Sequence, residues 1–294
     1  MGRKGSHEFG GDWTEQKLDI LARYLDAYVF ALKNKSYSTW YIDAFAGTGY
    51  RTPRQSTGQE EGLFADLLDP ASERLLHGSA VRALETDPPF AEYLFIERDP
   101  RRVKELEGLR QQYPARAGAI SVVQGEANDC IKRLCKESWS DRRAVLFLDP
   151  YGMQVEWDTI VAVAETRAID LWVLFPLGVA ANRLLPSSGI VPDGWRSALN
   201  RLLGSEEWFD RAYAQETTED LFGHVETRLV KQPADVIGEF FVERLRSAFA
   251  GVATKPRVLT NSKNSPLYLL CFAVGNPWAV KPALRIANHI LRKF

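Results

Sequence analysis

Five short apolar segments recur along the first two thirds of the chain. They are residues 40–45, 93–96, 120–123, 144–148 and 171–175. Continuous apolar runs of this length are typical of strands that are buried on both faces of a parallel sheet. Residues 100–113, 128–136 and 157–166 lie between them, have helix-like composition and contain little Gly or Pro. This alternation predicts a doubly wound, mostly parallel α/β sheet with right-handed crossovers.

Helical periodicity marks both ends of the chain. Apolar residues recur every three or four positions over residues 13–32, which predicts one amphipathic helix. The same spacing over residues 280–294 predicts a C-terminal helix. Two further apolar runs, residues 257–259 and 267–274, are expected to return to the sheet as strands.

Two long insertions interrupt the predicted core. The first crossover is unusually long and includes a helical segment near residues 79–85, and long connections in compact domains are often functional. Connections rich in Gly, Pro and Trp, with helices near residues 195–203 and 233–249, indicate a cap. The predicted parts are an N-terminal segment and helix (1–39), a Rossmann-like core (40–176, with a long loop at 50–92), a helical cap or elaboration (177–255), and C-terminal strands and a helix that complete the core (256–294).

Composition excludes several classes of protein. Apolar residues make up 45% and charged residues 26% of the chain, which is too apolar for global disorder. The formal net charge is -1, so any site for a polyanion must be a local patch. Cys130, Cys135 and Cys271 are odd in number and lack CxxC spacing, which argues against a disulfide framework and a structural zinc site.

The sequence gives no sign of a membrane segment. No apolar run approaches the roughly 20 residues that span a bilayer. The N-terminal MGRKGSHEFGGDW lacks the apolar region of a signal peptide. We therefore expect a cytoplasmic protein that binds no membrane and no metal.

The sharpest local motif is DAFAGTG, residues 43–49, which follows the first apolar segment. Glycines in such a turn let a ligand approach the backbone, and the amides there can hold an anionic group. A tight strand-to-helix turn without a ligand is the alternative. The third glycine of the dinucleotide motif G-x-G-x-x-G is absent after Gly49, which disfavours an NAD site.

Three further segments place polar residues just past a predicted strand: FIERD (95–99), VQGEAND (123–129) and LFLDPYG (146–152). Ligands of open α/β sheets bind outside the carboxyl ends of the strands. Glu97 is placed to accept hydrogen bonds from both hydroxyls of a ribose, whereas Asp99 before Pro100 suits a helix N-cap. Together with residues 43–49, these segments predict a ligand site along one edge of the sheet.

These four segments, in this order, resemble the strand ends of class I S-adenosylmethionine-dependent methyltransferases over residues 40–175. More closely, the whole chain resembles the three-Cys-motif partner proteins, a bacterial family with such a core. That resemblance rests on HEFGGDWTEQKL, DAFAGTG, FIERD, LFLDPYG and NSKNSPLYLLCFAVGNP. The family takes its name from a genetic neighbour with three cysteines that looks like a radical-S-adenosylmethionine protein, so the resemblance implies such a partner.

The resemblance also implies a site for S-adenosylmethionine. The loop at residues 43–49 would surround the methionine part, Glu97 would bind the ribose, and Glu126 would lie near the adenine. The predicted cofactor-binding residues are Asp43, Phe45, Ala46, Gly47, Thr48, Gly49, Glu97, Glu126 and Asn128.

By the same resemblance, Asp149, Pro150 and Tyr151 would face the methyl acceptor and form the catalytic set. The segment is similar to the D/N-P-P-Y motif of methyltransferases that act on exocyclic amino groups of bases. It has one proline fewer, so the tyrosine falls one position early. Methyl transfer from a sulfonium is an in-line displacement that depends on alignment more than on acid-base chemistry. We therefore expect Asp149 to orient the acceptor and to take up its proton late.

Candidate substrate-binding residues lie outside these motifs. His7 and Trp13 flank a glycine pair and are expected to fold over the cofactor or the acceptor, with a cap-and-core role as the alternative. Arg51 and Arg54 are candidates for a phosphate-binding rim, with solvated surface charge as the alternative. Lys263 lies in a polar segment before the last apolar run. The residues expected in the core or at the cap interface are Trp172, Trp208, Trp278 and Cys271.

The sequence thus predicts methyl transfer from S-adenosylmethionine to a nitrogen of a nucleic-acid base or nucleotide, with DNA or RNA as the partner. The alternative is a methyltransferase-like binding module that recognises nucleic acid or docks the three-cysteine partner without turnover. The glycine loop and Glu97 favour cofactor binding, whereas the single proline at Pro150 favours the alternative.

Overall fold

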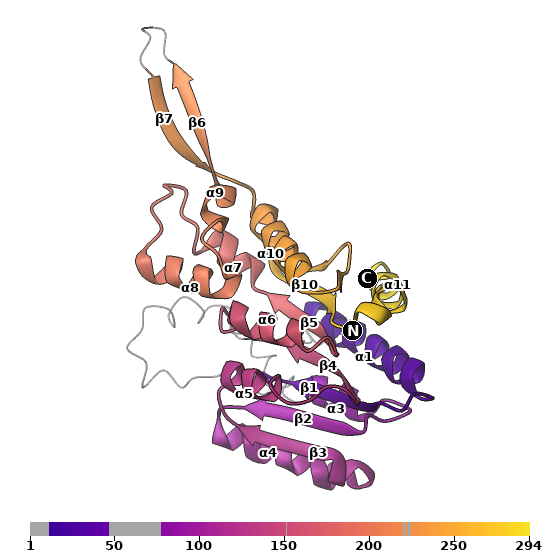
Figure 1. Cartoon of the computed structure of the whole chain (residues 1–294). Helices are drawn as coiled ribbons and strands as arrows, with labels where there is room; N and C mark the ends of the chain where they lie inside the picture. The colour runs from indigo at the N-terminus through magenta and orange to yellow at the C-terminus, as the bar shows by residue number, and fades with distance from the viewer. Residues whose placement is uncertain (1–11, 47–77, 151, 220–221, 223–224) are drawn as a thin grey trace, which may run out of the picture.

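The structure is a computed structural model that describes residues 12–46, 78–150, 152–219, 222 and 225–294 (Figure 1). Its central sheet has eight strands in the order β3-β2-β1-β4-β5-β10-β8, with β9 paired to β10. Strands β1 to β5 are parallel, and β10 runs antiparallel to β5, β8 and β9. The strands are β1 (Ser38–Asp43), β2 (Glu92–Glu97), β3 (Ile120–Gln124), β4 (Arg142–Leu148), β5 (Ile169–Phe175), β8 (Gly251–Val252), β9 (Arg257–Thr260) and β10 (Pro266–Val274).

Helices cover both faces of this sheet. Alternate strand residues point to opposite faces, so Tyr41 joins one apolar cluster and its neighbour Ile42 joins the other. One cluster is closed by α1 (Asp12–Leu32), α3 (Gly78–Leu84), α4 (Pro100–Gln112) and α11 (Val280–Leu291). The other is closed by α5 (Ala127–Leu134), α6 (Trp157–Glu165), α7 (Leu177–Asn182), α8 (Asp193–Leu203), α9 (Trp208–Ala212) and α10 (Ala234–Ala248). The predicted doubly wound, mostly parallel α/β sheet is confirmed.

Helix α1 runs along one face of the sheet from its carboxyl edge to its amino edge. Its buried stripe includes Leu18, Leu21 and Leu25, as the periodicity predicts. Near the amino edge, the Tyr24 hydroxyl donates to Asp170 of β5 over 2.8 Å. A 21-residue helix is about 30 Å long, so α1 contributes side chains to both edges of the sheet.

The segment between β5 and β8 contains a feature that the sequence analysis missed. The predicted helices near residues 195–203 and 233–249 are present as α8 and α10. Between them, β6 (Tyr213–Glu219) and β7 (Val225–Lys231) form an antiparallel hairpin that extends away from the rest of the molecule (Figure 1). Few of its residues are apolar, which is why its two-residue alternation is weak in the sequence.

The core predictions for single residues are confirmed with one exception. Trp172, Trp208 and Cys271 are buried, but Trp278 is 93% exposed, so its predicted place in the core or at the cap interface is wrong. Trp278 lies in the short 3-10 helix η4 (Pro277–Ala279), whose first turn is capped by the Asn276 side chain. A second short helix, η3 (Pro114–Ala119), precedes β3. None of the described helices combines the length and hydrophobicity that a bilayer crossing requires.

Candidate functional site

Four parallel strand ends meet at one edge of the sheet. Asp43, the last residue of β1, pairs in register with Phe95 of β2 and Phe147 of β4. The Ala46 amide donates to the carbonyl of Ile96 over 3.2 Å, which fixes the start of the loop after β1. The predicted convergence of these four segments along one edge is therefore confirmed by the strand pairing.

Asp43 is a buried carboxylate with one unsatisfied oxygen. Its Oδ2 accepts hydrogen bonds from the hydroxyls of Ser79, at 2.6 Å, and Tyr41, at 3.3 Å. Its Oδ1 meets no hydrogen-bond partner among the described residues. Burial raises the pKa of Asp43 to about 7, and the charge of Asp149 reinforces this rise, whereas the Ser79 and Tyr41 hydroxyls and the nearby Phe45 amide oppose it. A buried polar atom without a partner is rare and calls for an explanation, and a bound ligand is one.

Asp149 lies just past β4 and pairs with a lysine from α1. The Lys17 ammonium donates to Oδ2 of Asp149 and forms an ion pair with it. The Lys17 side chain is only 6% exposed, whereas that of Asp149 is 29% exposed. Pro150, the next residue, is buried. The predicted catalytic carboxylate is therefore at the sheet edge, with its position fixed by a partner that the sequence analysis did not identify.

Aromatic residues from two distant segments border the same edge. Trp13, in the first turn of α1, stacks on Tyr268 of β10 with ring centroids 5.3 Å apart. The Lys17 ammonium lies 5.2 Å from the centre of the Trp13 ring. Tyr268 lies at the carboxyl edge because the next residue of β10, Leu269, pairs in register with Phe175, the last residue of β5. Of the predicted substrate-binding residues, Trp13 is thus next to the Lys17–Asp149 pair, whereas Lys263 is exposed in the turn between β9 and β10.

Glu97 ends β2 and is 8% exposed. Its Oε1 accepts a hydrogen bond from the Asp99 amide at 2.6 Å, which turns the carboxylate toward the start of α4. Burial raises the pKa of Glu97, while the Asp99 amide and the charge of Arg102 oppose the rise. Asp99 caps α4 by accepting from the Arg101 amide at 2.9 Å, so its predicted N-cap role is confirmed.

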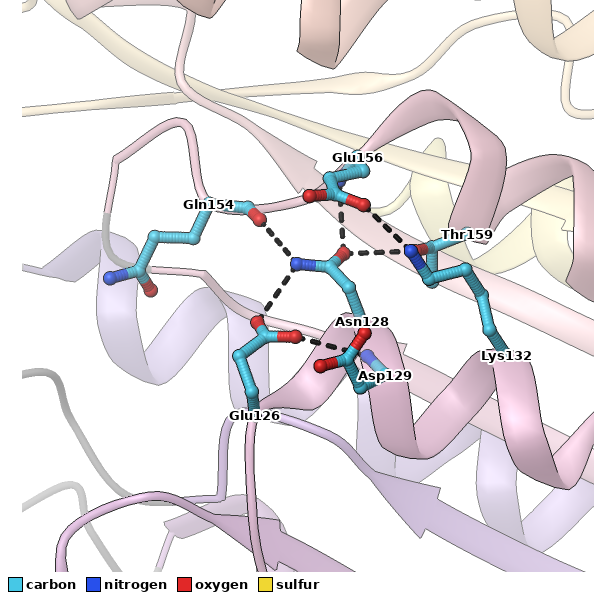
Figure 2. A network of polar contacts seen from close by, with 7 residues as sticks. All are labelled: Glu126, Asn128, Asp129, Lys132, Gln154, Glu156 and Thr159. Carbon is cyan, nitrogen blue, oxygen red and sulfur yellow. Dashed lines mark hydrogen bonds and ion pairs between the residues drawn. The ribbon is translucent and has the colours of Figure 1, made fainter.

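The end of β3 is held by a polar network around Asn128 (Figure 2). The Asn128 amide group donates twice and accepts twice, which fills its hydrogen-bonding capacity. Its partners are Oε1 of Glu126 and the carbonyl of Gln154, each at 2.9 Å, the amide of Glu156 at 3.0 Å, and the hydroxyl of Thr159 at 2.9 Å. The side chain therefore joins α5 to the segment before α6, with no polar atom left for a ligand.

Glu126 has a local role of its own. Its Oε2 accepts from the Asp129 amide at 3.0 Å and caps α5. Gly125, just before it, packs so tightly on α5 that a Cβ atom would lie 2.6 Å from Sγ of Cys130. This contact brings the start of α5 close to the end of β3 and gives the Glu126 carboxylate a fixed position at the sheet edge.

Several predicted site residues lie outside the described part of the chain. They are His7, Gly47, Thr48, Gly49, Arg51, Arg54 and Tyr151. The described cofactor-loop residues are Asp43, Phe45 and Ala46, of which Phe45 is half-buried. Within the described ranges, no group of three or more His, Cys, Asp or Glu residues is arranged to hold a metal ion.

Lys17 and Ser79 are the site residues that the sequence analysis missed. The sequence does contain a sign of the role of Lys17, because the residue lies four positions before Leu21 and seven before Tyr24. This spacing places Lys17 on the buried stripe of α1. A lysine on the apolar side of an amphipathic helix needs a buried partner. Ser79 had no such signal, since 36 residues separate it from Asp43 in the chain.

Neither protein-family models nor curated proteins match this sequence. Among solved structures, the chain is similar to protein LPL1258 from Legionella pneumophila, with 12% identity, a TM-score of 0.49, and coverage of 97% of this chain and 93% of that one. M. jannaschii TYW2 in complex with AdoMet is 10% identical, with a TM-score of 0.29 and coverage of 77% and 80%. A dimethyladenosine transferase from Plasmodium falciparum is 14% identical, with a TM-score of 0.30 and coverage of 78% and 66%.

Proposed function

We propose that the protein is an S-adenosylmethionine-dependent methyltransferase that acts on a nitrogen of a nucleic-acid base or nucleotide. The observation that supports this most is the presence of two buried carboxylates, Asp43 and Glu97, at the ends of adjacent strands. S-adenosylmethionine carries a cationic amino group at one end and a ribose diol near the other. Two carboxylates along one sheet edge complement such a ligand.

The unsatisfied oxygen of Asp43 suits the amino group of the methionine part. Oδ1 is buried and has no partner among the described residues, and a charge-assisted hydrogen bond from an ammonium would satisfy it. The Glu97 carboxylate uses Oε1 for the Asp99 amide and retains lone pairs for ribose hydroxyls. Glu126, held by Asn128, would lie beside the adenine, and Phe45, Ala46, Gly47, Thr48 and Gly49 would complete the cradle.

The acceptor would bind beside Asp149. S-adenosylmethionine, when bound, supplies an electrophilic methyl group on its sulfonium. Asp149 would accept a hydrogen bond from the acceptor nitrogen and take up its proton late, while Pro150 restricts the backbone next to it. Trp13 offers an aromatic surface on which a base can stack, and Tyr151 and His7 are proposed as further contacts. Arg51, Arg54 and Lys263 are proposed to meet the phosphates.

A second candidate function is a non-catalytic module that partners a three-cysteine radical-S-adenosylmethionine-type protein, as the family resemblance implies. The single proline at Pro150 favours it, because the motif of amino-group methyltransferases is incomplete. Cofactor binding without methyl transfer to any nucleic acid would support this candidate over the first.

The first test is calorimetric titration with S-adenosylmethionine and S-adenosylhomocysteine. We expect one saturable site in the native chain. Glu97→Ala should weaken binding by about 10- to 100-fold, since hydrogen bonds to a charged group contribute about 1.5–3 kcal/mol. The matched control is Glu105→Ala, an exposed glutamate on α4, which should bind normally. A folded native sample that binds neither ligand would contradict the proposal.

The second test measures transfer of a labelled methyl group to total RNA, sheared DNA and nucleotides. Asp149→Ala should retain cofactor binding and lose transfer. Full transfer by this variant would show that the catalytic assignment is wrong.

A further inference from the structure

The Lys17–Asp149 pair is asymmetric. Lys17 is almost fully buried, and the exposed part of the pair belongs to Asp149. Lys17 occupies Oδ2 of the carboxylate, and Oδ1 has no hydrogen bond from any described residue. Lys17 therefore holds Asp149 from the protein side and leaves one acceptor oxygen for a ligand.

Helix α1 presents Lys17 at a fixed place. The Trp13–Tyr268 stack anchors its first turn to β10, and the bond from Tyr24 to Asp170 anchors it near the opposite edge of the sheet. Lys17 lies between these two anchors, about two helical turns from Tyr24. Movement of α1 along its axis would break both anchors, so the lysine can fix the orientation of the carboxylate.

The charge of the pair limits which acceptors suit the site. Asp149 cancels the buried ammonium, and the Trp13 ring, 5.2 Å away, stabilises it further. An unpaired carboxylate at this place would attract cationic amines. A protonated amine has no lone pair with which to attack a methyl group. A neutral pair instead favours a neutral N–H donor.

Building on the proposed function, we infer that Lys17 is the positioning and specificity-determining residue of the acceptor site. It fixes Asp149 through Oδ2 and cancels its charge, so that Oδ1 receives a neutral N–H group. Amino and ring N–H groups of nucleobases belong to this class, and the ammonium groups of polyamines and lysine side chains do not.

The test compares adenosine and cytidine, as neutral N–H donors, with spermidine, as a cationic amine. Binding is measured by calorimetry with S-adenosylhomocysteine at saturation. The native protein should bind a nucleoside more tightly than spermidine. Lys17→Met, which removes the charge and the donor, should weaken nucleoside binding and strengthen spermidine binding, each by about tenfold or more. Lys17→Arg, which keeps the charge, should bind a nucleoside more tightly than spermidine, as the native protein does.

A second variant separates positioning from charge. Lys17→Gln keeps a hydrogen-bond donor without the charge, so it should bind nucleosides within a few fold of native while spermidine binding rises. These titrations are made at pH 8.5, above the pKa of about 7 of Asp43, so that the Asp43 carboxylate is ionised. Under this condition every variant should bind S-adenosylhomocysteine within a few fold of native. A native protein that does not bind S-adenosylhomocysteine would instead refute the cofactor proposal. An unchanged ratio of nucleoside to spermidine affinity in Lys17→Met and Lys17→Gln would overturn the inference. The inference would also be overturned if neither the native protein nor any of the three Lys17 variants bound a nucleoside or spermidine.

Discussion

Two buried aspartates of the central sheet, Asp43 and Asp170, differ in how their oxygens are used. Asp170, near the start of β5, accepts from the Tyr24 hydroxyl on one oxygen and from the Gly275 amide on the other, at 2.8 and 3.2 Å. Asp43, at the end of β1, accepts both of its hydrogen bonds on Oδ2 and leaves Oδ1 without a partner among the described residues. Burial raises the pKa of both, to about 6 for Asp170 and about 7 for Asp43.

Burial and a raised pKa therefore do not distinguish a structural carboxylate from a candidate ligand-binding one. The two aspartates differ in whether both carboxylate oxygens accept a hydrogen bond and in the edge of the sheet at which they lie. Asp170 is at the amino edge, where it joins α1, β5 and the residue after β10. Asp43 is at the carboxyl edge, where ligands of open α/β sheets bind.

The largest effect expected is on the pH dependence of stability. The pKa of Asp43 is about 7 in the folded chain and about 4 in an unfolded one. Between these values the folded state binds more protons, so the free energy of unfolding falls as the pH rises through this window. Asp43→Asn has no ionisable group at this position, so its free energy of unfolding does not fall in this way. In the absence of ligand, the free energy of unfolding of Asp43→Asn relative to that of the native chain should rise by up to about 4 kcal/mol between pH 4 and 7, as measured by urea unfolding.

The control for this measurement is Glu105→Asn, which removes a carboxylate from an exposed position on α4 and so shows the effect of losing a surface charge alone. A profile for Asp43→Asn that runs parallel to native would mean that Asp43 is not strongly desolvated.

A matched pair of alanine variants gives a smaller effect. At pH 5, Asp170→Ala should cost about 3 kcal/mol, because it leaves two buried donors unpaired. Asp43→Ala should cost less, about 1–2 kcal/mol, because it leaves one buried donor, the Tyr41 hydroxyl, without its 3.3 Å bond, whereas the half-buried Ser79 hydroxyl can turn to water. Chemical unfolding of both variants checks the difference. Equal losses would show that the two aspartates are equally structural.

The sheet was predictable because its strands are continuous apolar runs and its helices have clear periodicity. The regions at 93–96, 120–123, 144–148 and 171–175 all lie within observed strands. The β6–β7 hairpin was missed because it is mostly polar and exposed, so no burial pattern marks its strands. Trp278 was misplaced for a related reason: composition favours burial of a tryptophan, but the Asn276 cap and the turn at Pro277 leave this one on the surface.

The candidate site was only partly predictable. Residues that follow a strand, such as Asp43, Glu97 and Asp149, were found because parallel strands end at one edge. Lys17 and Ser79 join the site through contacts between segments that are distant in the chain, and no motif encodes such contacts. Asn128 was expected beside the cofactor, but its four hydrogen bonds within the protein depend on the placement of α6, which the local sequence does not show.

The role of Asp43 in cofactor binding is tested by the affinity for S-adenosylmethionine between pH 5.5 and 7.5, measured by calorimetry for the native chain and for Asp43→Asn. If Oδ1 of Asp43 holds the amino group of the cofactor, only the ionised carboxylate binds it well. Native affinity should then rise by about tenfold per pH unit below pH 7 and level off above it. Asp43→Asn should bind weakly with no such slope. Equal affinities with parallel pH profiles in the two proteins would contradict the assignment of Asp43 to the cofactor.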